Sequence, residues 1–211
     1  MKQKTYHIIR DHYLSKFRLH GACSAGVDWP NATDHRLRHK VMIDNCCIQT
    51  DDLTILDIGC GYGDFLDYLK EKEIDATYTG IDIGADFIAH CKNKFDSVDF
   101  FHADILDNEI NLGCFNVVVL NGVFTIKNEI GYEDMFDFVC RMILAAWEFV
   151  DDVLVFNLMS SHVDWEREDL FHCPLDRIVA FLVNDLSRNI KIRMDYGLYE
   201  YSVFVYRAAN H

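Results

Sequence analysis

The stretch ILDIGCGYGD at residues 55–64 constrains the fold of this chain more than any other segment. It begins as a short apolar run, which is typical of a buried strand, and continues as a turn with glycine at every second position. Glycine lets a bound molecule approach the backbone where any Cβ would block it. Phe65, Leu66 and Leu69 follow at helical spacing, and the free N–H groups that begin a helix attract negative groups. The segment therefore predicts a strand, a ligand-binding turn and a helix.

Two well-known glycine-rich turns do not fit this stretch. A phosphate-binding P-loop ends in Gly-Lys-Ser or Gly-Lys-Thr, whereas Gly63 is followed by Asp64. A dinucleotide-binding turn needs G-x-G-x-x-G, but Asp64 stands where the third glycine belongs, and its carboxylate would repel a pyrophosphate. The remaining pattern is D-x-G-x-G-x-G, with an acid ahead of the first glycine.

This pattern resembles the glycine-rich motif of the class I S-adenosylmethionine-dependent methyltransferases. The resemblance implies S-adenosylmethionine as the cofactor, and the matching positions of this chain are Asp57, Gly59, Cys60, Gly61 and Gly63. S-adenosylmethionine carries a sulfonium, an ammonium, a carboxylate and two ribose hydroxyls, but no phosphate. Acids beside the loop are therefore favourable for this cofactor and unfavourable for NAD.

Polar side chains after three further predicted strands extend the resemblance. Asp82 ends the second strand, 25 residues after the acid of the glycine-rich turn, and Ile83 follows it. The matching acid of the family accepts both ribose hydroxyls, which a carboxylate can do in bidentate fashion. Asp104 and Ile105 resemble the motif at the adenine edge, and Asn121 follows the fourth strand at the mouth of the sheet. An acid after a strand is often a helix cap, so the joint order and spacing carry the interpretation.

Strands and helices alternate from residue 53 to the end of the chain. The predicted strands cover 53–58, 77–83, 98–101, 115–120, 153–156, 190–195 and 199–207, and the helices between them cover 63–71, 84–94, 133–150 and 174–186. The last two strands are separated by three residues, too few for a crossover helix, so they must run antiparallel. We predict an α/β fold with a doubly wound, seven-stranded, mostly parallel sheet and a terminal antiparallel hairpin. The resemblance, over about residues 50–207, implies the Rossmann-like methyltransferase form of this fold.

Two further helices, at about 5–18 and 34–48, precede the first strand. We therefore predict an N-terminal helical extension or lid over residues 1–50 and a methyltransferase domain over residues 51–211, in one compact unit. Residues 1–40 carry eight basic and three acidic side chains, although the whole chain has a formal net charge of −14.

The basic extension allows two interpretations: a lid that accepts an anionic group, or a solvated helix pair on an acidic body. Arg38 is the first candidate to pair with the methionine carboxylate of the cofactor or with an anionic acceptor. In the alternative, Arg36 and Arg38 are solvated helix charges. The segment around His20 and residues 26–30 also resembles the leader of a bacterial subgroup of small methyltransferases linked to surface-polysaccharide and related small-molecule pathways.

The composition limits the partners and the location of the protein. Half of the residues are hydrophobic and only two are proline, which excludes a disordered chain. The net charge of −14 disfavours nucleic acid and anionic membranes as partners. No apolar run reaches the ~20 residues of a membrane span, and the first residues lack the apolar centre of a signal peptide. The eight cysteines form no Cys-x-x-Cys pair, so we expect free, mostly buried thiols, no metal site and a cytoplasmic protein.

Histidines are the candidates for a general base. His162 follows the fifth strand, His20 lies in the possible lid, and His172 belongs to the same loop as His162, although a structural role is open for each. A histidine would take the proton of a hydroxyl acceptor near neutral pH, whereas an anionic acceptor needs no base. We expect O-methylation of a small anionic or carbohydrate-derived metabolite. The alternatives are small-molecule N-methylation and a non-catalytic partner that binds S-adenosylmethionine; the oligomeric state is not predicted.

Overall fold

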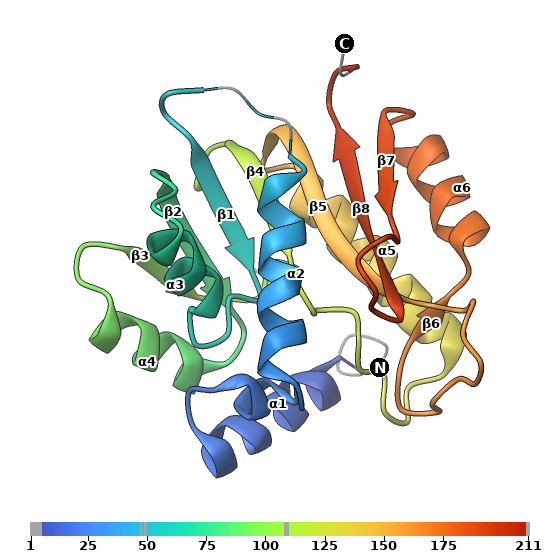
Figure 1. Cartoon of the computed structure of the whole chain (residues 1–211), viewed down its shortest axis with the longest axis horizontal. Coiled ribbons are helices and arrows are strands. Elements are labelled where there is room, and N and C mark those ends of the chain that lie inside the picture. Colours follow the sequence, from blue (N-terminus) through green and yellow to red (C-terminus); the bar gives the residue numbers. More distant parts are fainter. Residues whose placement is uncertain (1–5, 47, 49, 108–109, 210–211) are drawn as a thin grey trace.

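The computed structural model describes residues 6–46, 48, 50–107 and 110–209 (Figure 1). The helices are α1 (His7–His20), the 3-10 turn η2 (Ser24–Val27), α2 (Ala32–Asp44), α3 (Asp64–Glu71), α4 (Ala85–Lys94), α5 (Tyr132–Trp147) and α6 (Leu175–Asp185). The strands are β1 (Thr54–Ile58), β2 (Thr77–Asp82), β3 (Asp99–His102), β4 (Phe115–Leu120), β5 (Val150–Ser160), β6 (His172–Cys173), β7 (Ile190–Arg193) and β8 (Glu200–Tyr206).

The strands form one sheet in the order β3-β2-β1-β4-β5-β8-β7, and the short β6 pairs with β5 beside this path. The pairs from β3 to β5 are parallel, while β8 runs antiparallel to both β5 and β7. The predicted seven-stranded, mostly parallel sheet with a terminal antiparallel hairpin is confirmed. The two-residue β6 was not predicted, because its pairing depends on β5 rather than on a sequence pattern of its own.

Strand β4 shows why both faces of the sheet are covered. Its sequence FNVVVL is apolar on both sides, as expected for a central parallel strand. Val118 and Leu120 pack into one core with the buried residues of α5, whereas Val117 and Val119 pack into a second core with α3 and α4. Successive side chains of a strand point to opposite faces, so this split is the doubly wound arrangement.

Strand β5 is longer than the sequence indicated. The prediction covered residues 153–156, but the strand runs from Val150 to Ser160. It pairs with β8 from Val153 to Met159, and its last residues, Asn157 and Ser160, are buried although they are polar. Pairing with β8 therefore extends the strand beyond its apolar run.

The N-terminal extension packs against both cores. Tyr6 and Ile9 belong to the core on the α5 face, and Val41 and Met42 belong to the core on the α3 and α4 face. Figure 1 shows α1 below the carboxyl ends of the parallel strands and α2 running across the front of the sheet. The extension is therefore an integral part of the described fold.

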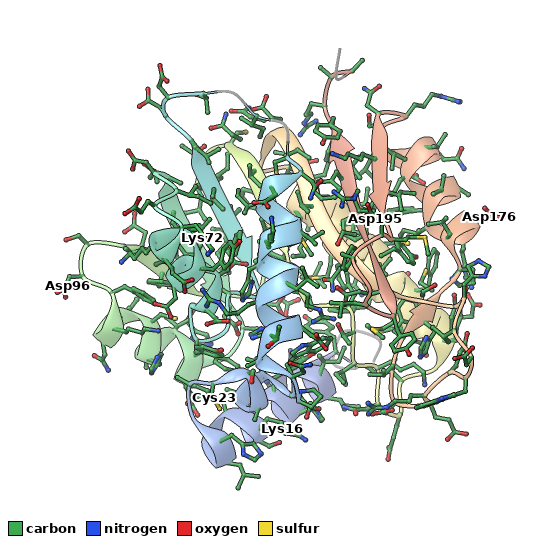
Figure 2. The ribbon with its side chains drawn as sticks, in the orientation of Figure 1. Lys16, Cys23, Lys72, Asp96, Asp176 and Asp195 are labelled. Carbon is green, nitrogen blue, oxygen red and sulfur yellow. The ribbon has the colours of Figure 1, made fainter. Side chains whose placement is uncertain are left out.

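Ion pairs account for the basic charge of the extension. Lys16, which Figure 2 labels near the lower end of the molecule, pairs with Asp28 at 2.7 Å. Arg18 on α1 donates to Asp86 on α4 at 2.7 Å, and Arg36 on α2 pairs with Glu71 on α3. The first pair lies within the extension, and the other two join the extension to the acidic body, so these basic side chains are paired within the chain.

The described cysteines, Cys23, Cys46, Cys60, Cys91, Cys114, Cys140 and Cys173, form no disulfide with one another. Cys23 and Cys114 are exposed, Cys140 is partly buried, and the other four are buried. Most of these thiols are therefore buried, as expected, but not all. Cys47 lies outside the described residues. Across the described part of the chain, no helix has both the length and the apolar character needed to cross a membrane.

Candidate active site

A cavity of about 790 Å³ lies at the carboxyl ends of the parallel strands, where ligands bind in doubly wound sheets. One part of its wall is the glycine-rich loop and the residues after β2, β3 and β4. The opposite part comes from α1, η2 and α2 of the extension and from the loop between β5 and β6. The cavity is therefore enclosed by segments that lie far apart in the sequence.

The glycines of the loop do not all serve the cavity. Gly59 and Gly61 line it with positive φ angles of 82° and 53°, in the region that favours glycine. Gly63 also has a positive φ but is absent from the cavity lining, and a Cβ there would lie 2.5 Å from the ring of Phe95. Gly63 thus permits close packing of the loop against α4, rather than approach of a ligand as the sequence indicated.

Cys60 lines the cavity between these glycines and is buried. Its hydrogen bond with Cys91 and its burial raise the pKa of the Cys60 thiol. A protonated, buried thiol is a weak nucleophile, so Cys60 acts as part of the wall.

Asp82 ends β2 and holds the loop in place. The backbone N–H of Gly61 donates to Oδ2 at 2.9 Å, and that of Gly84 donates to Oδ1 at 2.6 Å. Each carboxylate oxygen keeps another lone pair, and Asp82 and the neighbouring Ile83 line the cavity. Burial raises the pKa of Asp82 to about 6, although the two backbone donors oppose the shift.

Asp57, at the end of β1, also lines the cavity. Tyr78 of β2 donates its hydroxyl to Asp57 Oδ2 at 2.6 Å. Burial raises the pKa of Asp57 to about 7; the hydrogen bond from Tyr78 opposes this shift and the charge of Asp82 adds to it. Asp57 and Asp82 therefore make this end of the cavity able to accept hydrogen bonds and positive charge.

Asp104 and Ile105, after β3, line the cavity next to the extension. Tyr6, just before α1, donates its hydroxyl to Asp104 Oδ2 at 2.6 Å, and the backbone N–H of Leu106 donates to Oδ1 at 3.0 Å. The tyrosine ring also stacks on Phe138 of α5 with centroids 5.2 Å apart. The acid at the predicted adenine edge is thus in contact with the extension, which sequence spacing did not indicate.

Arg38 of α2 is buried, so the solvated alternative is wrong for this residue. Its Nε and Nη2 groups donate to Glu200 Oε2 of β8, the first at 2.8 Å. The guanidinium carbon also lies 3.4 Å from the centre of the Trp29 ring. Arg38 lines the cavity, but its ionic partner is a carboxylate of this chain. Arg36 is about one-third exposed and matches the solvated alternative better.

A cluster that the sequence analysis missed connects α2 to the loop. His39 Nε2 lies 2.8 Å and His35 Nδ1 lies 3.2 Å from Asp64 Oδ2, and Asn121 Nδ2 lies 2.9 Å from His39 Nδ1. All four residues line the cavity. Burial, helped by the neighbouring His39, lowers the pKa of His35 to about 3. Burial alone would raise the pKa of Asp64, but the hydrogen bond and charge of His39 outweigh it and lower that pKa.

The i, i+4 spacing of His35 and His39 could have revealed this cluster, because such residues share one helix face. No sequence pattern pairs that face with Asp64. The side-chain oxygen of Asn121 is buried without a hydrogen-bond partner among the described residues, and it is available to a ligand.

The structure separates the histidines that were predicted as bases. His20 lines the cavity, whereas His162 does not, although its neighbours Val163 and Asp164 do. His172 is buried in the lining, but Nδ1 lies 2.7 Å from the carbonyl oxygen of Ser160 and Nε2 accepts from the backbone N–H of Arg167 at 3.2 Å. His172 is therefore a structural histidine, and His162 stands next to the lining residues Val163 and Asp164 without itself lining the cavity.

The chain is similar to known methyltransferases. A methyltransferase domain family matches residues 55–146. A Mycobacterium tuberculosis protein named as a methyltransferase is 27% identical over 168 residues, which are 75% of this chain and 96% of that protein. A malonyl-acyl-carrier-protein O-methyltransferase of Acetivibrio thermocellus is 35% identical over 81 residues, only 37% of this chain and 28% of that enzyme. The crystal structure of magnesium protoporphyrin IX methyltransferase from Synechocystis, with S-adenosylmethionine bound, covers 97% of both chains at 16% identity and a TM-score of 0.66.

The cavity fits S-adenosylmethionine, which is bound in the Synechocystis structure. Two loop glycines bring backbone to the cavity, Asp57 and Asp82 offer carboxylates with free lone pairs, and the orphaned Asn121 oxygen offers a further acceptor. None of these groups requires a phosphate on the ligand. Residues 55–146 match a methyltransferase domain, and the chain is an S-adenosylmethionine-dependent methyltransferase. Its cofactor is S-adenosylmethionine.

Proposed function

We propose that this enzyme methylates an oxygen, most simply a hydroxyl, of a small carbohydrate-derived or other ring-shaped acceptor. The observation that carries the proposal is the continuation of the cavity beyond the glycine loop, between the extension and the loop from β5 to β6. Aromatic side chains line this part: Tyr13, Trp29, Trp165 and Tyr199. Pockets for small molecules are lined in this way by apolar and aromatic groups with a few polar atoms.

Polar atoms in the same region support a hydroxyl-bearing acceptor. Trp29 Nε1 and Thr125 Oγ1 line the cavity and are buried without a hydrogen-bond partner in the described part of the chain. An indole N–H donates, and a threonine hydroxyl both donates and accepts. Because unpaired buried polar groups are costly, an acceptor that satisfies them gains affinity.

The charge of the cavity favours this acceptor over an anionic one. Among the described residues, the lining holds seven aspartates but three arginines, namely Arg10, Arg38 and Arg167. Each of the three pairs with a carboxylate of the chain, Asp11, Glu200 and Asp169 respectively. An anionic acceptor would therefore meet a net negative wall with its cations already paired.

The cofactor supplies an electrophilic methyl group on a sulfonium, and the chain has to orient the acceptor and exclude water. Asp82 holds the ribose hydroxyls, Asp104 and Ile105 the adenine, and the loop with Asn121 the methionine end. The extension closes the cavity from the opposite side. His20 is the predicted base that lines the cavity, so it takes the proton of the hydroxyl.

The name of one similar protein supports methyl transfer to oxygen rather than to nitrogen. The Acetivibrio enzyme is an O-methyltransferase, although the match covers only part of each chain and a malonyl group offers a carboxylate rather than a neutral hydroxyl.

The test measures binding first and methyl transfer second. S-adenosylmethionine and S-adenosylhomocysteine should raise the melting temperature of the full chain, whereas NAD should not. The enzyme is then incubated with methyl-labelled cofactor and a panel of small hydroxyl, carboxyl and amino compounds, and tandem mass spectrometry locates the label. A label on nitrogen would contradict O-methylation. Cofactor binding without turnover on any acceptor would favour the non-catalytic partner.

Two histidine variants test the base. His20→Ala should lower kcat by roughly 10²–10⁴-fold for a hydroxyl acceptor, the usual contribution of a general base. His162→Ala is the matched control and should leave kcat within about threefold, because His162 does not line the cavity. If the two variants change kcat equally, neither His20 nor His162 is the general base.

A further inference from the structure

His35, His39 and Asp64 bring three metal-binding atoms together at one point of the cavity wall. The atoms are His35 Nδ1, His39 Nε2 and a carboxylate oxygen of Asp64, and all lie within 4.8 Å of one another. We propose that these residues bind a divalent transition-metal ion such as Zn²⁺, between helix α2 of the extension and the start of α3. This inference rests on the cluster alone and does not depend on the acceptor of the methyl group.

The two distances that involve Asp64 are close to those around a small cation. Asp64 Oδ2 lies 2.8 Å from His39 Nε2 and 3.2 Å from His35 Nδ1. Zinc bonds of about 2.0–2.1 Å to nitrogen and oxygen place neighbouring ligand atoms of a tetrahedron about 3.3–3.4 Å apart. One of the two separations is already close to this value and the other needs to widen by about half an ångström.

The backbone presents the three ligands on rigid elements. His35 and His39 are separated by one turn of α2, so their rings point from the same helix face and lie with centroids 4.8 Å apart. Asp64 is the first residue of α3, directly after Gly63 in the left-handed conformation. A site built on α2 and on the first residue of α3 needs little ordering when the ion binds.

Asn121 supplies a partner for the ring of His39. Its amide lies 2.9 Å from His39 Nδ1, the nitrogen that does not face Asp64. Rotation of the amide exchanges its N and O atoms, so Asn121 can accept a hydrogen bond from Nδ1–H while Nε2 binds the metal, and in that state its Nδ2, not its oxygen, faces the cavity. Hydrogen bonds to the second ring nitrogen orient metal-binding histidines in this way.

The donor set indicates the class of ion. Two imidazoles and one carboxylate suit Zn²⁺, Co²⁺ or Ni²⁺, whereas Mg²⁺ and Ca²⁺ prefer sites built entirely from oxygen. Three protein ligands leave one position of a tetrahedral ion unfilled, and all three residues line the cavity. The bound ion would join the extension to the glycine loop and keep one exchangeable position at the cavity.

The experiment uses the full chain without an affinity tag, after removal of metals by a chelator. Titration with Zn²⁺ in a calorimeter should show one ion bound per chain at micromolar affinity or better, with a rise in melting temperature. Co²⁺ should give the visible absorption of a four-coordinate site with nitrogen ligands. His35→Ala and His39→Ala should each weaken Zn²⁺ binding more than tenfold, and Asn121→Ala about tenfold or more.

Two control variants make the assignment specific. His7→Ala alters the other described group of three such ligands, His7, Asp104 and Asp107, and should leave Zn²⁺ binding unchanged. Cys23→Ser removes an exposed thiol and should also have no effect. If His39→Ala perturbs the circular dichroism spectrum, Asp64→Asn replaces it as the ligand variant. The proposal is overturned if Zn²⁺ produces no heat and Co²⁺ no absorption, or if binding survives the cluster variants, or if it is lost in either control.

Discussion

The two halves of the cavity are built in different ways. The half that holds the loop glycines, Asp82, Asp104 and Asn121 comes from one continuous run of strands and helices, and its polar residues follow successive strands. The opposite half joins α1, η2 and α2 to the loop before β6, from parts of the chain more than a hundred residues apart. The first half can be deduced from order along the chain, whereas the second exists only through contacts between distant segments. Variants that act on one half and leave the other unchanged therefore test this division.

The largest effect is expected at the contact that links α2 to the far end of the sheet. Arg38→Ala would leave the buried Glu200 without its ionic partner, and among the described residues Asn157 and Tyr196 remain as its side-chain donors. Removing one partner of a buried ion pair costs about 3–5 kcal/mol, so the free energy of unfolding should fall by that amount in urea denaturation. Arg36→Ala, on the same helix, loses a partly exposed pair with Glu71 and should cost about 0–1 kcal/mol. Equal losses would show that the extension is not anchored through Arg38.

The next effect concerns the cofactor half. Asp82→Ala removes a carboxylate that lines the cavity and that also accepts from Gly61 in the loop. The affinity for S-adenosylhomocysteine should fall by about 1.5–3 kcal/mol in calorimetry, the scale of lost hydrogen bonds to a charged group. Asp86→Ala, on the outer surface of α4, is the control and should leave the affinity unchanged. If Asp82→Ala leaves the affinity unaltered, Asp82 only holds the loop and does not bind the cofactor.

A pH series sharpens the same contact. The pKa of Asp82 is raised to about 6 in the free protein, mainly by burial, while hydrogen bonds from ribose hydroxyls would favour its ionised form. Binding therefore lowers this pKa, and protonation opposes binding. The affinity for S-adenosylhomocysteine should decrease by up to about tenfold per pH unit below pH 6, and this contribution of Asp82 should level off above it. Asp82→Asn should remove the pH dependence of the affinity. If the dependence persists in this variant, another titrating group causes it.

The smallest effect is expected at the open side of the acceptor half. Trp165 lines the cavity yet is 71% exposed. Trp165→Ala should change the free energy of unfolding by less than about 0.5 kcal/mol and leave cofactor affinity unchanged, while raising the KM of the acceptor. Leu19→Ala removes an equally exposed apolar side chain, 74% accessible and outside the lining, and should not alter KM. If both variants leave KM unchanged, Trp165 does not contact the acceptor.

Much of the cofactor half followed from the sequence because its requirements are local. Gly59 and Gly61 line the cavity with positive φ angles, and Asp57, Asp82, Ile83, Asp104, Ile105 and Asn121 all reach it from the predicted strand ends. Gly63 was misjudged because a glycine needed for packing against Phe95 has the same appearance in sequence as one that approaches a ligand. His162 was misjudged for a related reason. Position after a strand indicates the correct end of the sheet, but not which residues of the loop over 161–171 face the cavity.

The sequence by itself determined the succession of the seven longer strands along the chain, the doubly wound sheet, the antiparallel hairpin and the place of the glycine loop. These depend on apolar runs, glycine spacing and connection lengths, each of which is set within a few neighbouring residues. Tertiary structure alone decided that Arg38 meets Glu200, that Tyr6 donates to Asp104, and that His35 and His39 converge on Asp64. The physical reason is that a charge or a hydrogen-bonding atom interacts according to its distance through space and its burial, and neither is encoded in separation along the chain.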